Sequence, residues 1–302
     1  MSRPALKKED YTVVWLTAIP IEYEIAQLML DEVHDNNFHS VPGGSYVYQA
    51  GEVCGHNVII ATLPKEYGNS SAAALASEVK ICFPNLRFGL LVGVAAGLPN
   101  LSKGKDIRLG DVLVGESIVA YDLGKITKDG FEPLLDNVTK PDMLVASAFR
   151  NLEVKNDPKI HLQYYEKIIN GDHRDRFKDP GEENDHGGGC AQNKREKRLD
   201  SERHRVWYGR IGSGDKVVKY DQTSNELRDR YDIIGLEMEA AGVMKCMPVG
   251  VIRGVCDYGT QSKDKKWQSY AAATAAAYAK AVLKTIPPNR TLGMYRILDN
   301  FI

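Results

Sequence analysis

An apolar run near the end of the chain contains an arginine and ends on an aspartate. The run is VIRGVCD at 251–257, and it predicts a buried strand that ends on Asp257. Strand ends of parallel sheets build ligand sites, where a carboxyl group can act as a general acid. Arg253 lies four residues earlier, and the two-residue period of a strand predicts that both side chains share one face and one pocket. Taken alone, Asp257 equally fits a helix N-cap or a turn residue.

A second acidic segment precedes this run by a few residues. LEMEAAG at 236–242 contains Glu237 and Glu239 on either side of Met238. Carboxylates can anchor the hydroxyl groups of a sugar, and a thioether can cover its apolar face. By itself, however, the segment also predicts an ordinary helix start with favourable acids in its first turn.

The order and spacing of the two segments resemble the nucleoside phosphorylase and nucleosidase family, and the nucleosidase branch in particular. GLLVGVAAGL at 89–98 and LGDVLV at 109–114 extend the resemblance. It then covers most of the chain except the region 137–205. The companion segments therefore favour an active site over two unrelated turns.

The resemblance implies an α/β fold, namely a single three-layer domain over residues 1–302 with a central twisted mixed sheet flanked by helices. A polar insertion is expected at about 137–205, because residues 170–205 are rich in glycine and in both charges and lack apolar periodicity. Hydrophobic periodicity predicts strands at 11–16, 46–53, 56–63, 88–94, 111–119, 206–213 and 249–255. It predicts helices at 21–31, 71–83, 143–152, 222–230 and 267–285, and a continuous segment at 235–247.

Each motif residue takes a role from this resemblance. Cleavage of a purine nucleoside passes through an oxocarbenium-like sugar and an electron-rich leaving base. Asp257 matches the aspartate that protonates the purine, and Arg253 the arginine that helps to place water. Glu239 matches the glutamate that holds the ribose hydroxyls, with Met238 under the sugar and Glu237 beside them.

The nucleophile is predicted from the stretch TAIPIE at 17–22, which contains no arginine or lysine. Phosphorylases of this family carry a phosphate-clamping arginine there. Glu22 instead matches the nucleosidase glutamate that orients and deprotonates water. Glu24 is a competing candidate, and either acid alone fits a solvated first helical turn. Phosphorolysis stays open if Lys65 or an arginine from a neighbouring subunit supplies the phosphate contact.

The base site is predicted from SGDKVV at 213–218. This segment resembles the one that lays a strand edge against the purine, with Asp215 at its start and Val217 and Val218 flanking the ring. Adenine rather than guanine follows from the resemblance to adenine-releasing nucleosidases, because backbone groups can recognise either base.

The insertion carries DRF at 175–177 and DHGGGC at 185–190, which resemble a stretch of fungal family members found beside nucleotide-binding and repeat modules. Related immune effectors release adenine from ATP, whose phosphates require cations. A charged run is equally typical of a solvated loop. The candidate phosphate ligands are Lys65, His173, Arg174, Arg176 and Lys178. His186 and Cys190 without a second pair are a weak metal signal, so we expect no metal and no cofactor.

Composition limits the other function classes. The formal net charge is −1, which gives no overall attraction to nucleic acid or to anionic lipid. Five cysteines lie scattered without a CxxC pair, which is typical of a reducing cytosol. No apolar run approaches the ~18 residues of a membrane span. We expect a cytoplasmic homo-oligomer whose partner is a small purine nucleotide or nucleoside. A rival hypothesis is a nucleotide-sensing module without turnover, against which the full set of acids argues.

Overall fold

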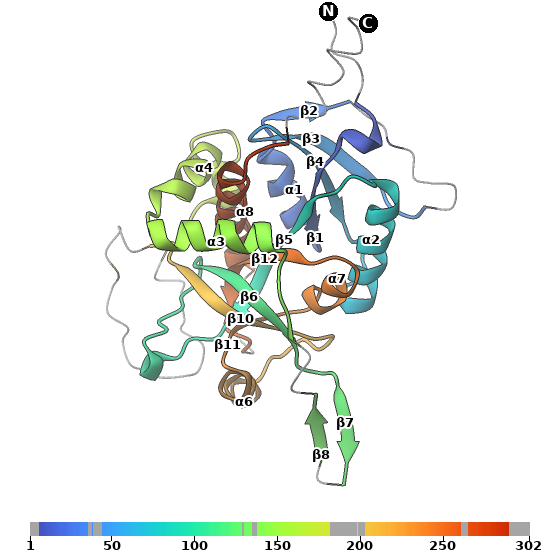
Figure 1. Ribbon diagram of the computed structural model, residues 1–302. Helices are drawn as coiled ribbons and strands as arrows, with labels where there is room; N and C mark the ends of the chain where they lie inside the picture. Colours follow the sequence, from blue (N-terminus) through green and yellow to red (C-terminus); the bar gives the residue numbers. More distant parts are fainter. Residues whose placement is uncertain are drawn as a thin grey trace, which may run out of the picture.

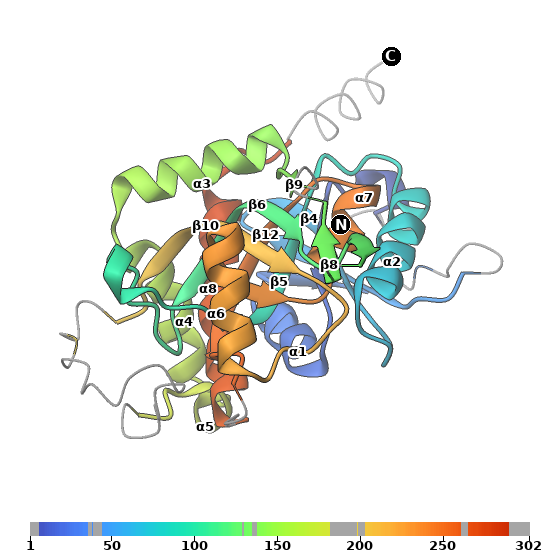
Figure 2. The same cartoon turned by 90° about the horizontal axis from the view of Figure 1, so that it is seen from below.

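The computed structural model describes residues 6–35, 38, 44–128, 130–134, 138–181, 198, 203–260 and 265–289. Helices cover both faces of a central sheet, as Figure 1 shows with α2 and α7 on one side and α4 and α8 on the other. The predicted α/β architecture with a mixed sheet is confirmed. Figure 2 shows the same layers from below.

The sheet has ten strands within the described residues, in the order β11-β10-β6-β12-β5-β1-β4-β3-β2, and β9 pairs with β6. Strand β12 runs parallel to β5 and antiparallel to β6, so the sheet is mixed. Strands β7 and β8 form a separate hairpin that extends away from the body (Figure 1). The strands are β1 (Val13–Thr17), β2 (Glu32–His34), β3 (Tyr48–Val53), β4 (His56–Thr62), β5 (Phe88–Gly97), β6 (Val112–Ala120), β7 (Gly124–Thr127), β8 (Gly130–Pro133), β9 (Val138–Thr139), β10 (Val206–Ser213), β11 (Ile233–Glu237) and β12 (Val249–Asp257).

One additional pairing decides where the functional residues lie. The end of β11 pairs antiparallel with the end of β5, with Gly235 opposite Gly97 and Leu236 opposite Ala96. Strands β11, β10, β6, β12 and β5 therefore close into a ring. Arg253, in the middle of β12, lies opposite Gly93 in β5, so the end of β11 reaches the same part of the sheet as these two residues.

Two apolar cores, one on each face of the sheet, hold the helices. The larger core packs α1, α3, α4 and α8 against the sheet, and α8 is alanine-rich and almost entirely buried. The second core packs α2 and α7 against the other face. The helices are α1 (Pro20–Leu28), α2 (Asn69–Cys82), α3 (Met143–Lys155), α4 (Lys159–Ile169), α5 (Arg174–Phe177), α6 (Asp221–Tyr231), α7 (Ala240–Cys246) and α8 (Lys266–Thr285), with short 3-10 turns at Lys8–Asp10 and Leu101–Lys103.

Several local predictions differ from the structure. Helix α4 was not predicted, although its buried His161, Tyr165 and Ile168 follow helical spacing. The segment 235–247, to which the sequence gave no element type, is the end of β11 followed by helix α7. Helix α2 has no side-chain cap of its own, since Gly68 is the N-cap.

Candidate active site

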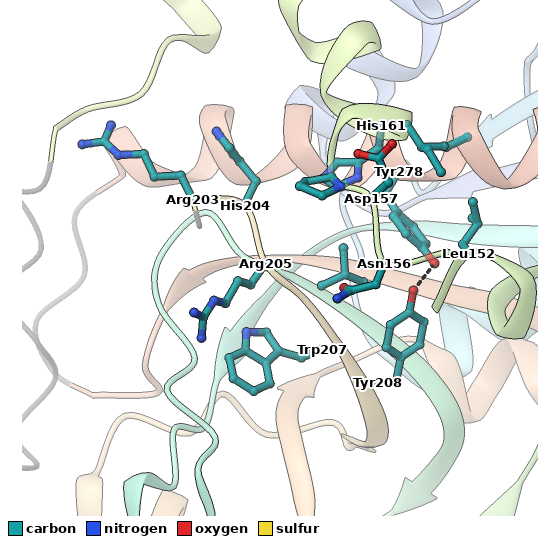
Figure 3. Close-up of a pocket in the computed structure, with 14 residues that line it drawn as sticks. Leu152, Asn156, Asp157, His161, Arg203, His204, Arg205, Trp207, Tyr208 and Tyr278 are labelled. Atoms are coloured by element: carbon teal, nitrogen blue, oxygen red, sulfur yellow. Dashed lines mark hydrogen bonds between the residues drawn. The ribbon is translucent and has the colours of Figure 1, made fainter. Parts of the chain in front are cut away.

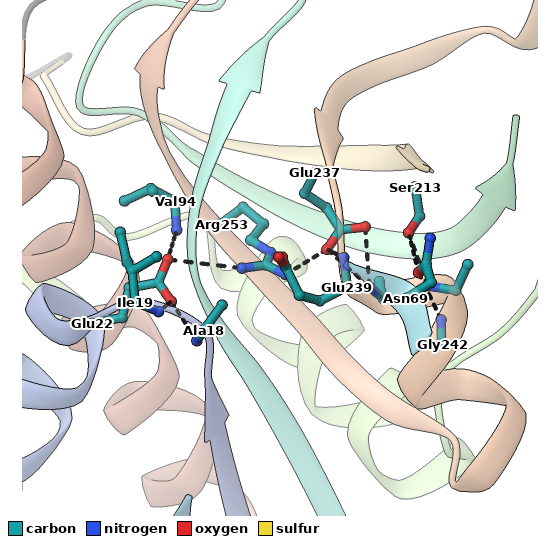
Figure 4. A network of polar contacts seen from close by, with 12 residues as sticks. Ala18, Ile19, Glu22, Asn69, Val94, Ser213, Glu237, Glu239, Gly242 and Arg253 are labelled. Carbon is teal, nitrogen blue, oxygen red and sulfur yellow. Dashed lines mark hydrogen bonds and ion pairs between the residues drawn. The ribbon is translucent and has the colours of Figure 1, made fainter. Parts of the chain in front are cut away.

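Glu22 lies in the first turn of α1, directly after β1, and its carboxylate is buried. One oxygen, Oε2, accepts hydrogen bonds from the backbone N–H groups of Ala18 at 2.8 Å and Ile19 at 3.2 Å. The other, Oε1, accepts from the backbone N–H of Val94 at the end of β5, at 2.8 Å. Pro20 begins the helix, a position where its missing N–H is tolerated. The loop and the neighbouring strand thus fix this carboxylate in place (Figure 4).

Arg253 is fully buried in the middle of β12 and lies among three carboxylates. Its Nη2 donates to Glu237 and to Oε2 of Glu239, the latter at 3.2 Å. Its Nη1 lies 4.0 Å from Oε1 of Glu22 and has no hydrogen-bond partner among the described residues. Burying these charges is tolerable only because they are paired with one another.

The close approach of Glu22 and Arg253 requires a glycine in the neighbouring strand. A Cβ atom at Gly93 would overlap both the Glu22 carboxylate and the Arg253 guanidinium. Because Gly93 lies opposite Arg253 in the β5–β12 register, any side chain there would push the two charged groups apart.

Glu237 organises the start of helix α7. Its carboxylate accepts from the backbone N–H groups of Glu239 at 3.0 Å and Ala240 at 2.9 Å, in addition to Arg253. This places Glu239 at the N-cap of α7 and holds it against the guanidinium. On the far side of the helix start, Asn69 accepts from the backbone N–H of Gly242 at 2.8 Å. The two Glu237 oxygens are therefore engaged by the protein itself.

Asp257 ends β12 and accepts a hydrogen bond from the backbone N–H of Gly259 at 2.8 Å. The register of β12 on β5 shifts between Val255 and Asp257, so that Cys256 is an extra residue. The period-two argument that put Asp257 on the same face as Arg253 does not hold across this bulge. Asp257 lines a cavity, whereas Arg253 is not one of the described lining residues.

The cavity has a volume of about 250 Å³ and gathers most of the residues predicted from the motifs. Among the described residues, four acidic side chains and one lysine line it. They are Glu22, Glu237, Glu239, Asp257 and Lys216. Met238, Val217 and Val218 supply apolar surface.

Burial and mutual repulsion shift the acids of this cluster. Burial raises the pKa of Glu22, against the opposing effects of Arg253 and the three backbone N–H donors. Burial, together with the charges of Glu237 and Glu22, raises the pKa of Glu239 to about 7, although Arg253 opposes this. Near neutral pH the cluster can therefore take up and release protons.

The structure separates Asp215 from the two valines predicted beside it. Its carboxylate accepts from the backbone N–H of Asn69 at 2.7 Å, and its own N–H donates to Asp122. It thus caps helix α2 from a distant loop. Asp215 is not among the described residues that line the cavity.

The predicted phosphate ligands lie away from the described cavity lining. Arg176 in α5 forms an ion pair with Glu24 at 2.5 Å, and Lys178 pairs with Asp175 at 3.0 Å. Lys65 is exposed in the loop that leads to α2. Glu24, the alternative to Glu22, thus points to α5 rather than to the cavity.

Comparisons with known proteins show which proteins this chain is similar to. No protein-family model matches the chain. A Nucleotide-binding leucine-rich repeat (NLR)-like protein of Hyaloscypha variabilis is 36% identical over 98% of this chain and 31% of its own length. The ATP nucleosidase Cap17 of Escherichia coli is 23% identical over 88% of this chain and 49% of its own length.

Among solved structures, the 5'-methylthioadenosine/S-adenosylhomocysteine nucleosidase of Neisseria meningitidis, in complex with methylthio-immucillin-A, superposes with a TM-score of 0.62. It is 20% identical, and the match covers 91% of this chain and 99% of that one. The chain therefore has the fold of the nucleoside phosphorylase/nucleosidase family. The chain spans about a third of the NLR-like relative and about half of the ATP nucleosidase.

Three polar residues of the described cavity lining were not predicted. Tyr67 lies just before α2, Lys216 lies between the named Asp215 and Val217, and Gln268 lies in the first turn of α8. The position of Lys216 within SGDKVV was the one available signal. Nothing in the sequence pointed to Tyr67 or Gln268, since both reach the cavity through tertiary packing.

The DHGGGC stretch at 185–190, with His186 and Cys190, lies outside the described residues. Within the described ranges, no group of three histidine, cysteine or acidic side chains has the arrangement of a metal site. No helix of those ranges is both long and apolar enough to cross a membrane.

Proposed function

We propose that this cavity hydrolyses the N-glycosidic bond of a purine nucleoside or nucleotide and releases the free base. The observation that carries the proposal is the gap between Glu22 and Arg253. Oε1 of Glu22 and Nη1 of Arg253 lie 4.0 Å apart, and Nη1 has no hydrogen-bond partner in the described part of the chain. A water molecule bridging them would receive a hydrogen bond from the guanidinium and donate one to the carboxylate.

In the proposed reaction, Asp257 in its acid form donates a proton to the purine as the bond to C1′ of the ribose breaks. Glu22 removes a proton from the water that attacks C1′, and its raised pKa suits it to that role. Glu239 accepts hydrogen bonds from the ribose hydroxyls. The products are the base and the free sugar, and solvent returns the proton from Glu22 to Asp257. Val217, Val218 and Met238 would cover the apolar faces of base and sugar.

The charge of the cavity favours water over phosphate as the nucleophile. Four acids and one lysine line its described surface, so an inorganic phosphate would enter against net negative charge. Arg253 cannot compensate, because Glu237 and Glu239 already pair with it.

Chromatography of base release tests the proposal directly. Adenosine, guanosine, AMP and ATP are incubated with the protein in phosphate-free buffer and again with phosphate. We expect adenine release without phosphate, and free ribose or its 5-phosphates as the second product. Ribose 1-phosphate, or an absolute need for phosphate, would replace hydrolysis by phosphorolysis. Asp257→Asn should lower the rate by ~10² to 10⁴.

We propose adenine as the base and ATP as the preferred substrate, supported by the similarity to an ATP nucleosidase. Because acids dominate the cavity, the 5′ phosphates would have to point out of it towards cations. The candidates are Lys216 in the lining and Lys65, His173, Arg174, Arg176 and Lys178 outside it.

A paired comparison separates the nucleotide proposal from plain nucleoside hydrolysis. Neutralising Arg174 and Arg176 should weaken the binding of ATP far more than the binding of adenosine. Each charge-assisted hydrogen bond to a phosphate contributes ~1.5 to 3 kcal/mol, and adenosine has no phosphate. Lys216→Gln is compared in the same assay. Equal losses for both substrates would show that α5 only supports the fold through its pair with Glu24.

We further propose that this chain is the purine-cleaving module of a larger immune effector, because the match to the NLR-like protein covers 98% of it. Expression in cells should then lower the ATP pool, and Glu22→Gln should abolish that effect. We also propose a homo-oligomer, which the molar mass in solution will test.

A further inference from the structure

A second, larger cavity lies at the opposite end of β10 from the candidate active site. Its volume is about 430 Å³, and its described lining comes from the loop between α3 and α4, the start of β10 and the second half of α8 (Figure 3). Ser213 ends β10 near the first cavity, whereas Trp207 near its start lines the second. A strand of eight residues is about 26 Å long, so the two cavities are separate sites.

The second cavity carries cations and an indole. Arg205 and Trp207 lie two positions apart and therefore on one side of the extended chain, and Figure 3 draws their side chains next to each other. Arg203 also lines the cavity and pairs with Asp179 at 3.1 Å. The acid of the lining, Asp157, accepts from the backbone N–H of Lys159 and so caps helix α4. Guanidinium groups next to an aromatic face are well suited to a planar anion.

Two histidines form the inner wall of this cavity. His161 is 3% exposed, and its Nε2 has no hydrogen-bond partner within the ranges that the structure describes. His204 adopts a left-handed backbone conformation with φ of 62°, which is uncommon for a residue other than glycine. Its ring binds the Tyr270 hydroxyl at 3.0 Å. A buried polar atom without a partner beside a polar cavity indicates a missing ligand or water.

We propose that the second cavity binds a small organic anion in which a planar ring carries a phosphate or carboxylate group. Trp207 would face the ring, and Arg205 and Arg203 would hold the anionic group. The volume lies within the ~300 to 1,000 Å³ of small-molecule pockets and accommodates one ring system with its anionic substituent. The proposal does not depend on hydrolysis in the first cavity.

The indole N–H signals of the tryptophans provide the test. The chain has three tryptophans, of which Trp207 lines the second cavity and Trp267 neighbours Gln268 in the first. Protein with ¹⁵N-labelled tryptophan is titrated with AMP and, separately, with indole-3-carboxylate. The Asp257→Asn background prevents turnover of AMP, and Trp207→Phe assigns the signal.

We expect a saturable shift of the Trp207 signal, with AMP or indole-3-carboxylate binding at least tenfold more tightly than adenosine or inorganic phosphate. Arg205→Gln should weaken this binding at least tenfold. Arg150→Gln, an exposed arginine of α3 paired with Glu153, is the matched control and should change nothing. Whichever probe binds identifies phosphate or carboxylate as the recognised group.

Three results would overturn the proposal. The Trp207 signal could stay in place with both probes up to about 10 mM, which corresponds to less than ~3 kcal/mol of binding. AMP could shift the Trp267 signal and leave that of Trp207 in place, which would mean that Trp207 does not face the bound ring. Finally, Arg205→Gln with unchanged thermal stability could bind as tightly as the parent. Each result is independent of base release, so failure here and failure of hydrolysis are distinguishable.

Discussion

The two cavities of this protein carry opposite charges and protect them in different ways. Acids line the first, and each is held by backbone N–H groups or by the buried Arg253. Arginines and histidines line the second, where the histidine rings are buried next to tyrosines. The first cavity therefore stores charge within a pre-organised network, whereas the second keeps its inner wall neutral.

This difference predicts opposite pH dependence of stability. Burial raises the pKa of Glu239 to about 7, so the stability that its protonated form contributes is lost as the pH rises from its unfolded value towards 7. Burial lowers the pKa of both His161 and His204 to about 4, so the stability of their neutral forms is lost as the pH falls from about 6.5 towards 4. Substitutions in the first cavity should change only the loss of stability as the pH rises towards 7. Substitutions in the second cavity should change only the loss as the pH falls towards 4.

The largest expected effect separates two glutamates of the same helix. Glu22→Gln should lower the rate of base release by ~10² to 10⁴, because the amide cannot accept the proton of water. Glu24→Gln is the matched control, since Glu24 pairs with Arg176 outside the cavity, and its rate should stay within about threefold. Steady-state kinetics on adenosine and ATP measures both. Equal losses would return Glu24 to the list of candidate bases.

Removing the central cation should destabilise the fold. Arg253→Leu leaves Glu237, Glu239 and Glu22 without their buried partner, and the expected loss is about 3 to 5 kcal/mol in the free energy of unfolding by urea. Arg150→Leu breaks an exposed pair and should leave the free energy of unfolding nearly unchanged. Adding Glu239→Gln to Arg253→Leu should restore part of the loss. Similar losses for the two arginines would mean that the cluster does not depend on its cation.

The loss of stability as the pH rises towards 7 depends on Glu239. Glu239→Gln should flatten the fall in unfolding free energy between about pH 4.5 and 7, which for this carboxyl amounts to roughly 3 kcal/mol. Urea unfolding at several pH values measures the slope, with Glu24→Gln as the control. An unchanged slope would assign the proton uptake of the cluster to another group.

The smallest expected effect concerns the loss of stability as the pH falls towards 4, which depends on the histidines of the second cavity. His161→Phe removes a ring whose folded pKa is about 4, so the loss of stability between about pH 6.5 and 4 should become shallower. This loss of stability should become smaller but not disappear, because His204 remains. His173→Phe, at the exposed residue that precedes α5, provides the control. A steeper loss of stability between about pH 6.5 and 4 in His161→Phe would contradict the assignment.

Local patterns in the sequence were sufficient for the elements with strong periodicity. The strands around Trp15, Ile60 and Ile252 are apolar on both faces and were predicted from their apolar runs, because a short run of this kind is recognisable without knowing which strands it pairs with. Helix α4 was missed because the polar residues after it dominated the interpretation of the whole region.

By itself the sequence selected the acids, Arg253 and the valines as candidates, since they are adjacent to strands that can be recognised locally, and the structure gathers most of them around one cavity. Only the tertiary structure decided how they meet. The pairing of β11 with β5 brings Glu237 and Glu239 to Arg253, and Gly93 leaves the space in which Glu22 approaches it. Asp215 and the cations of α5 were predicted to contact the ligand because they lie within or next to motifs in the sequence. Their partners, Asn69 and Glu24, are 146 and 152 residues distant, so no local pattern contains those contacts.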